Sequence, residues 1–187
     1  NPCVGFGGVG GANFDFLWWS TQQLESNFTP PVGFHDGDGV GLYIAPLVAY
    51  RQTNSRWGVM LQAGYDSRKG DFEQVITPCN CPADLETDLS YITVEPSLRF
   101  APFKSGFYLY GGPRLAFNVD KSFTYQLGTN PAFPNQAANP EEDGNFSDVK
   151  GTLLSMQIGA GYDIPLSAMG KHNQFVLSPF LPFHTYF

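Results

Sequence analysis

The chain lacks both a long apolar run and a basic cluster. Its longest apolar stretch without a charge, Gly39 to Tyr50, contains Pro46 and falls well short of the roughly 20 residues of a membrane-spanning helix. A helical membrane protein is therefore not expected. No stretch gathers the Lys and Arg side chains that neutralise phosphates, and the formal net charge is −7, which argues against a nucleic-acid partner.

Charge is also scarce. Charged residues make up 14% of the chain and hydrophobic residues 42%, whereas about a quarter of the residues in a soluble domain are charged. Most acidic residues fall between the strands predicted below, where water can solvate them. The amino end has no charged start followed by an apolar core, so we expect a signal peptide to have been removed.

The chain is rich in stretches where apolar residues alternate with small or polar ones. From Trp57 to Asp66, one face collects the bulky apolar side chains and the other collects Gln62, Asp66 and glycines. A period of two predicts a strand with one apolar face. The pattern predicts seven strands, at about residues 8–19, 39–51, 56–67, 89–100, 106–119, 151–164 and 174–186.

The gaps between these strands alternate in length. Those at residues 20–38, 68–88 and 120–150 are long and rich in Pro, Asn and Asp, and the others are tight. Outer-membrane barrels have short periplasmic turns and long external loops. The sequence therefore predicts an all-β protein of the bacterial outer membrane: an antiparallel transmembrane β-barrel, one domain over residues 1–187, with its amino end in the periplasm. Because single-chain barrels close with an even number of strands, we expect eight, the eighth beyond Phe187.

A soluble barrel would turn the apolar face inward. An eight-stranded barrel has an interior only just wide enough for side chains to fill, and more than twenty Phe, Trp, Leu, Ile and Val residues would overfill it. The apolar face is therefore predicted to face lipid and the polar face the lumen. Carboxylate–guanidinium pairs are expected to block a continuous water path there. The predicted lumen charge network is Asp15, Arg51, Asp66, Glu95, Arg99, Arg114 and Asp163.

Aromatic residues gather at both ends of the predicted strands. Amphipathic rings lie at headgroup level in membrane proteins, so we predict two interfacial girdles. Those flanking the short turns are Tyr50, Trp57, Phe100, Phe107, Tyr162 and Phe175, and those towards the long loops are Trp18, Tyr65, Phe117 and Phe183.

Proline residues lie inside the predicted strands, where they remove ladder hydrogen bonds that hydrocarbon cannot replace. We expect bulges or loosened pairing at Pro46, Pro96, Pro113, Pro179 and Pro182. Pro46, Pro96 and Pro113 share the lipid-facing side near mid-strand, so an alternative is a thinned wall that another protein covers.

The three cysteines leave two states open. Cys3 is predicted on the opposite membrane side from Cys79 and Cys81, which excludes its pairing with either. Cys79 and Cys81 are either bridged across one residue or two free thiols. Without a nearby His or second Cys pair, they predict no zinc site.

Other candidates for chemistry are weak. His184 lies near Ser178 on the inward face but adjoins no nucleophile-and-base pattern, so a lumen histidine is expected. The sequence from Asp36 to Gly39 resembles the start of a calcium loop, but the closing Glu is absent, and a turn is expected. We therefore predict no enzyme, no cofactor and no metal site.

Four short sequence motifs, spread over nearly the whole chain, resemble those of a known family. They lie at residues 10–14, 92–100, 107–113 and 159–163. In these motifs the chain resembles the OmpA-like outer-membrane barrels, particularly the porin-like group common in Bacteroidota. The resemblance implies a small barrel with a plugged lumen. Members are often followed by a periplasmic domain that binds peptidoglycan, an activity that these residues do not carry over.

The expected role is therefore non-enzymatic: stabilising the envelope or displaying loops. An accessory subunit of a larger outer-membrane secretion or nutrient-uptake complex is an alternative, and so is a small diffusion pore. The lumen network could also open transiently as a gate. The expected partners are outer-membrane lipid and, through the long loops or the lipid-facing wall, other outer-membrane proteins.

Overall fold

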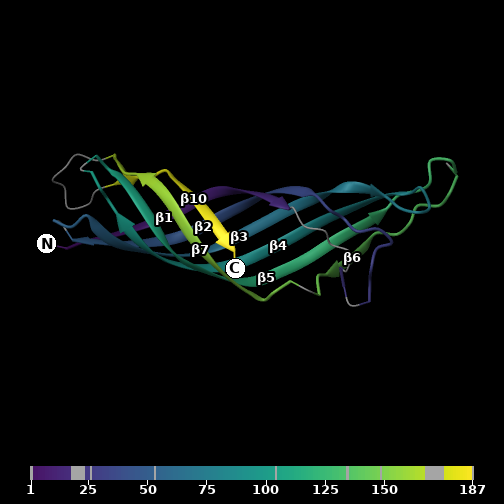
Figure 1. Ribbon diagram of the computed structural model, residues 1–187, viewed down its shortest axis with the longest axis horizontal. Helices are drawn as coiled ribbons and strands as arrows, with labels where there is room; N and C mark the ends of the chain where they lie inside the picture. Colours follow the sequence, from purple (N-terminus) through teal and green to yellow (C-terminus); the bar gives the residue numbers. More distant parts are fainter. Residues whose placement is uncertain are drawn as a thin grey trace.

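The computed structural model describes residues 2–17, 24–25, 27–52, 54–103, 105–133, 135–147, 149–166 and 175–186. The side chains of residues 2, 13, 15–17 and 184–186 lie outside this description. The described part contains no helix long and apolar enough to cross a membrane. Its secondary structure consists of β-strands, most of which curl into one elongated sheet (Figure 1).

The strands are β1 (Pro2–Leu17), β2 (Gly37–Gln52), β3 (Trp57–Ile76), β4 (Pro82–Phe100), β5 (Phe107–Leu127), β6 (Glu142–Asn145), β7 (Thr152–Tyr162), β8 (Ile164–Pro165), β9 (Val176–Leu177) and β10 (Phe180–Tyr186). The main sheet follows the order β1-β2-β3-β4-β5-β7-β10, with β6 beside β5, and β8 pairs with β9. Every pairing is antiparallel.

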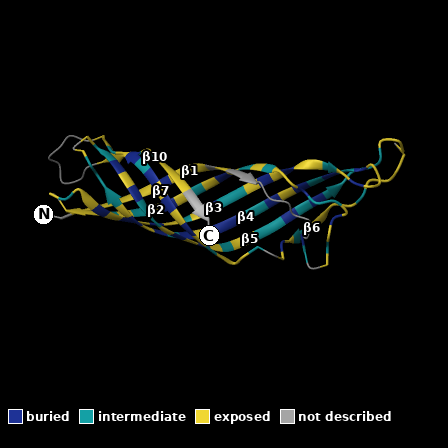
Figure 2. Ribbon diagram, viewed as in Figure 1, coloured by how far each residue is buried: buried dark blue, intermediate teal, exposed yellow. Residues whose placement is uncertain are grey.

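The two faces of the sheet differ in polarity, as expected of a membrane barrel. Exposed and buried residues alternate along the strands (Figure 2). On β2, the outward Leu42 and Ile44 are 60% and 58% exposed, whereas Ala45 on the inward side is buried. Arg114 and Asp66 on the inward face are 1% and 0% exposed. Apolar side chains therefore point out and polar ones in, the reverse of a soluble barrel.

The prediction that residues 68–88 form an external loop is wrong. β3 and β4 continue through these residues in register, with Lys69 opposite Asp88 and Phe72 opposite Leu85, and only residues 77–81 form the turn. The alternation does not stop at residue 67; its polarity reverses, so that apolar residues point inward and charged ones outward. A search for an outward apolar stripe ends where that reversal begins.

The predicted gap at 120–150 is also partly strand. β5 extends to Leu127, and β6 pairs with its outer end. The register shifts between Ser90 and Tyr91, which face Asp120 and Asn118, so Val119 is the extra residue. A bulge of this kind inserts one residue and reverses the side-chain parity beyond it. It turns Phe123 inward, where it is buried.

The predicted strand boundaries change at both ends of the chain. β1 begins at Pro2 rather than at residue 8 and ends at Leu17. The predicted strand 174–186 is instead two strands, β9 and β10, separated by Ser178 and Pro179. Proline cannot donate a ladder hydrogen bond, and Pro179 here accepts one, from the backbone N–H of Tyr162 at 3.1 Å.

β1 and β10 stand at the two ends of the sheet order. Because six antiparallel steps separate them, they run in the same direction, and they do not pair with each other within the described residues. The eighth strand expected beyond Phe187 stays a prediction.

Beyond the apolar band, β3 (from residue 67), β4 (to residue 90), β5 (from residue 120) and β6 form a region that we call the outer extension. Leu24, Phe28 and Phe34 from the segment before β2, and Phe146 and Val149 from the segment after β6, pack on its inner face. Phe34 and Tyr125 meet edge to face at 6.2 Å, and Phe123 and Phe146 lie 5.2 Å apart between ring centroids. The buried cluster comprises Leu24, Phe34, Phe72, Ala83, Leu85, Phe123, Tyr125 and Phe146.

Candidate functional site in the barrel interior

Arg114 on β5 is the centre of a buried charge cluster. Its Nε donates to Glu95 Oε1 on β4 at 2.9 Å, and its Nη2 donates to Asp66 Oδ2 on β3. The three residues are 1%, 4% and 0% exposed, respectively. All three occupy inward positions of neighbouring strands, so the period-two alternation brings them together. One guanidinium therefore ties three adjacent strands from the inside.

Two further groups complete this cluster. Arg68 donates from Nη2 to Asp66 Oδ2 at 2.9 Å, and the Tyr43 hydroxyl donates to Glu95 Oε1 at 3.2 Å. The guanidinium of Arg68 also lies 5.6 Å from the centroid of the Tyr91 ring. Two carboxylates thus face two guanidinium groups, a balance that offsets part of the cost of burying each charge.

A second cluster lies nearer the predicted periplasmic end. Arg99 Nη2 donates to Asp163 Oδ2 at 2.5 Å, and Ser178 Oγ donates to Asp163 Oδ1 at 2.8 Å. The Arg99 guanidinium stacks on the Tyr108 ring, 3.7 Å from its centroid. Arg99, Asp163 and Tyr108 come from β4, the residue after β7, and β5, so this cluster also joins separate strands.

Apolar side chains occupy the interior beside the second cluster. Met60, Tyr108 and Tyr110 are buried there, and Phe180 of β10 meets the Tyr110 ring edge to face at 5.9 Å. From the predicted periplasmic end outward, the interior therefore contains an ion pair with an aromatic layer, then the Arg114 cluster, and finally the apolar cluster of the outer extension.

The predicted lumen residues divide into three groups. Asp66, Glu95 and Arg114 lie together, and Arg99 lies with Asp163. Arg51 joins neither cluster: it is exposed at the end of β2, where the strand leaves the packed interior, and makes no ion pair with another described residue. The side chains of Asp15 and His184 lie outside the described residues, so their predicted places stay predictions.

Sequence reasoning missed two members of the Arg114 cluster. Arg68 falls in the predicted gap at 68–88, although it continues the inward series of Gln62, Gly64 and Asp66. Tyr43 was not singled out, although it lies opposite in parity to Leu42 and Ile44. Extending the alternation of inward and outward residues beyond the last outward apolar residue would have found Arg68.

The described girdle residues on strands of the main sheet lie on its outward face, and Phe175, which precedes β9, is exposed. The rings of Trp57 and Phe100 lie 4.5 Å apart between centroids, tilted by 39°. The pairing aligns Tyr65, Ile92 and Phe117 in one row across three strands. Their membrane levels stay a prediction, and Trp18 lies outside the described residues. The exposed members are Tyr50, Trp57, Tyr65, Phe117, Tyr162, Phe175 and Phe183, and the partly buried ones are Phe100 and Phe107.

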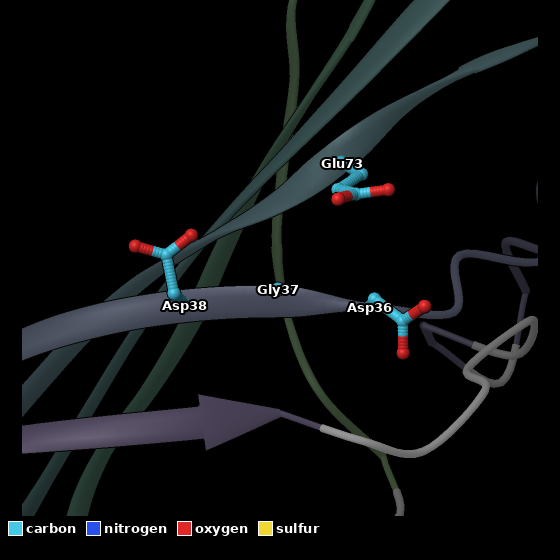
Figure 3. Close-up of a pocket in the computed structure, with 4 residues that line it drawn as sticks. All are labelled: Asp36, Gly37, Asp38 and Glu73. Atoms are coloured by element: carbon cyan, nitrogen blue, oxygen red, sulfur yellow. The ribbon is translucent and has the colours of Figure 1, made fainter.

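The acidic segment that resembled a calcium loop forms one side of a shallow pocket. Asp36, just before β2, lines it together with Gly37 and Asp38 of β2 and Glu73 of β3 (Figure 3). Gly37, Asp38 and Gly39 pair with β3 within the sheet, so these three residues are strand rather than part of the expected turn. The three carboxylates do not converge on one point in Figure 3. Within the described ranges, no group of three His, Cys, Asp or Glu residues could hold a metal ion.

A curled antiparallel sheet with an apolar outer face and buried ion pairs inside defines a transmembrane β-barrel. The chain matches the family model of the outer membrane protein beta-barrel domain over residues 4–180, and it belongs to that family. It is a protein of the bacterial outer membrane. No curated protein and no solved structure matches the chain.

Proposed function

We propose that this barrel is non-enzymatic and closed to solutes, and that it holds a rigid structure outside the cell, stabilising the envelope and displaying loops. The observation that carries the proposal is the buried cluster of Arg114, Asp66 and Glu95, which joins three strands across the interior. An open channel would leave these charges in water rather than 1%, 0% and 4% exposed.

Energetics favour a closed rather than a gated interior. Separating Arg114 from its partners would leave a buried charge uncompensated, which costs about 3–5 kcal/mol when one partner of such a pair is removed. A spontaneous opening against that cost would be rare.

The outer extension supports the display role. Its inner face has its own apolar cluster, and its outer face carries acidic side chains such as Asp71 and Glu86. A packed region of this kind holds a fixed shape, unlike a solvated loop. The long segment between β5 and β6 is tied to it, since Asn130 Nδ2 donates to Cys79 O at 2.7 Å.

Conductance tests the closed interior. The purified barrel in a planar bilayer is expected to show no channel openings, whereas a general porin inserted in the same membrane conducts. The double variant Arg114→Ala/Glu95→Ala removes the bridge and should pass ions. Steady openings of the wild-type protein would establish a diffusion pore instead. A silent double variant would show that the Arg114 cluster is not what closes the lumen.

Protease accessibility tests the display role. Glu141 and Glu142 are exposed at the start of β6, and Arg56 is exposed in the short turn before β3. On intact cells, a glutamate-specific protease should cleave at Glu141 or Glu142, while trypsin should spare Arg56 until the outer membrane is permeabilised. Cleavage at Arg56 alone in intact cells would show that the orientation is the opposite of the proposed one.

The finer relationship to OmpA-like barrels, and to their porin-like group in Bacteroidota, is part of this proposal. It is supported by the motifs at residues 92–100 and 107–113, which form the middle of the lipid-facing wall on β4 and β5. A solved structure of a member of that group with the same Arg114 cluster would support the relationship. A different interior in such a structure would count against it.

A role as an accessory subunit is the second candidate, and one observation favours it. The register that pairs Val94 with Leu115 and Leu98 with Gly111 places Pro96 opposite Pro113. Neither proline can donate, and the intervening ladder pairs are absent. The backbones also crowd: a Cβ on Gly112 would lie 2.0 Å from Pro96 O. Backbone acceptors without partners are costly beside hydrocarbon, and a protein neighbour would cover them.

Copurification separates this second candidate from the first. After gentle detergent extraction, an accessory subunit should be recovered with a stoichiometric membrane partner. Crosslinkers placed at Leu61 and Leu115, beside the prolines on the outward face, should then capture that partner. Crosslinking to lipid alone, with a monomeric barrel, would remove the candidate and leave the structural role.

A further inference from the structure

The turn between β3 and β4 carries a disulfide at the far end of the outer extension. Cys79 and Cys81 are bridged across Asn80, with their Cα atoms 5.2 Å apart. The turn lies at the end of the molecule opposite the amino terminus, in the blue-teal part of the chain (Figure 1). By the proposed orientation it lies at the end of the barrel that points away from the membrane, open to thiols in the medium.

The bridge adds little to holding this turn together. Thr77 and Cys81 are joined by the backbone bond Thr77 N–H to Cys81 O at 3.0 Å, and Asn80 N–H donates to Thr77 O at 2.9 Å. β3 and β4 pair immediately below, at Ile76 and Pro82. A crosslink stabilises a fold mainly by closing a long loop in the unfolded chain, and this one closes a loop with a single intervening residue.

The two sulfur-bearing residues differ in accessibility. Cys79 is exposed, whereas Cys81 is 3% exposed. In thiol–disulfide exchange, a thiolate attacks one sulfur and the other sulfur leaves, so access decides which sulfur is attacked. An incoming thiolate can reach Cys79 and is kept from Cys81 by the turn around it.

From this asymmetry we propose that the tip is a thiol-exchange site for low-molecular-weight thiols, with Cys79 as the sulfur attacked. The thiolate forms a bond to Cys79 Sγ, the Cys79–Cys81 bond breaks, and Cys81 leaves as a thiolate that takes up a proton from water. A second thiol then attacks the mixed disulfide. The external thiols become a disulfide, and the two cysteines take up two electrons and two protons.

The surroundings of the two cysteines fit both the disulfide and the form with two free thiols. Cys81 Sγ lies 3.5 Å from Cys79 O, so a released thiol has an acceptor in place. Thr77 Oγ1 lies 3.0 Å from Cys79 Sγ. Asn130 holds Cys79 O from the neighbouring loop, and Gly128 N–H donates to Pro82 O at 2.7 Å. The conformation of that loop should therefore respond to opening of the bridge.

Peptide mapping by mass spectrometry tests the assignment. Cys3→Ser protein, which keeps only the bridge cysteines, is exposed to reduced glutathione, quenched and digested. The mixed disulfide should be found on Cys79, with Cys81 free, in about tenfold excess over the reverse adduct. Adducts mainly on Cys81 would overturn the proposal. So would a bridge that stays intact while glutathione opens the same bridge in the unfolded chain.

Single-cysteine proteins give an independent test that does not depend on the bridge. Cys3→Ser/Cys81→Ser leaves Cys79, and Cys3→Ser/Cys79→Ser leaves Cys81. Both should fold like the parent, judged by circular dichroism, because pairing of β3 and β4 does not need the bond. Oxidised glutathione should modify Cys79 about tenfold faster than Cys81. Equal rates in the folded proteins would contradict the proposed asymmetry.

Discussion

The membrane-spanning part and the outer extension are built from the same strands with opposite polarity. Along β4, the inward Thr93 and Glu95 are polar and the outward Leu98 is apolar, whereas above the boundary Leu85 points inward and Glu86 outward. The backbone alternation is unchanged through the strand. The comparison teaches that the medium outside, acyl chains or water, decides which face carries the apolar residues.

The two parts therefore depend on different interactions. The outward face of the membrane-spanning part lies in lipid, so its apolar side chains give no hydrophobic stabilisation there. This part relies on hydrogen bonding and buried ion pairs. The outer extension is stabilised as soluble proteins are, by removing apolar surface from water. Substitutions at matched positions can separate these two sources of stability.

The largest effect is expected at Arg114. Arg114→Met leaves Glu95 buried and without its guanidinium partner, so the free energy of unfolding should fall by about 3–5 kcal/mol. Adding Glu95→Gln should recover most of the loss, because Asp66 keeps Arg68 at 2.9 Å. Urea unfolding in lipid vesicles measures both variants. If Arg114→Met were as stable as the wild type, the interior cluster would not support the membrane-spanning part.

A matched pair on β3 tests the change of medium directly. Leu61 and Asp71 lie on the same outward face, with Leu61 47% exposed in the apolar band. Leu61→Arg should cost about 2–4 kcal/mol if that position faces acyl chains near the bilayer centre. Asp71→Arg should change stability by no more than about 0.5 kcal/mol. Equal costs, again from urea unfolding in vesicles, would remove the distinction between the two parts.

Much of this contrast could be predicted from the sequence. The alternation located the spanning part of each central strand and placed Asp66, Glu95 and Arg114 on the inward face. It failed above the boundary, because Phe72 and Leu85 reverse the polarity on which the prediction depended. A search for an outward apolar stripe could not find the extension, although the alternation continues through it. The residues that cover its apolar face lie far away in the chain.

Three other features needed the three-dimensional structure. The bulge at Val119 reverses the parity of β5, and no residue type marks it in the sequence. The contact of Ser178 with Asp163 depends on how the chain returns after β9. The bridge between Cys79 and Cys81, one of two states left open, is formed in the structure.

A smaller effect is expected at Tyr125 in the outer extension. Its buried hydroxyl has no hydrogen-bond partner among the described residues, so Tyr125→Phe should raise the free energy of unfolding by about 1 kcal/mol. Burial raises the pKa of the Tyr125 phenol. The unfolded chain therefore loses its proton first, and stability should fall as pH rises above about 10.

Chemical unfolding at neutral and alkaline pH measures both parts of this prediction. In Tyr125→Phe, the free energy of unfolding should fall less above about pH 10 than in the wild type, because this phenol no longer titrates. A variant less stable than the wild type at neutral pH would mean that the hydroxyl makes a stabilising contact, contrary to the prediction.

The smallest effect is expected on the outer face of the extension. Lys69 Nζ lies 2.7 Å from Asp88 Oδ2, and hydrogen bonding to Asp88 raises the pKa of Lys69. The contribution of the pair is present below the ordinary lysine pKa and is lost as pH rises through the raised value. Exposed pairs are weak and screened by salt, so Lys69→Met should leave unfolding unchanged in high salt. A clear loss of stability from Lys69→Met in high salt would contradict the conclusion that this outer face is solvated.

Nitroxide side chains placed singly along β3 provide the most direct test of the polarity change. In Cys3→Ser protein reconstituted in lipid vesicles, a label at Leu61 should collide with oxygen, one at Asp71 with a water-soluble nickel chelate, and one at Gln62 with neither. A label at Leu61 that is shielded from oxygen, with Gln62 open to either reagent, would contradict the account.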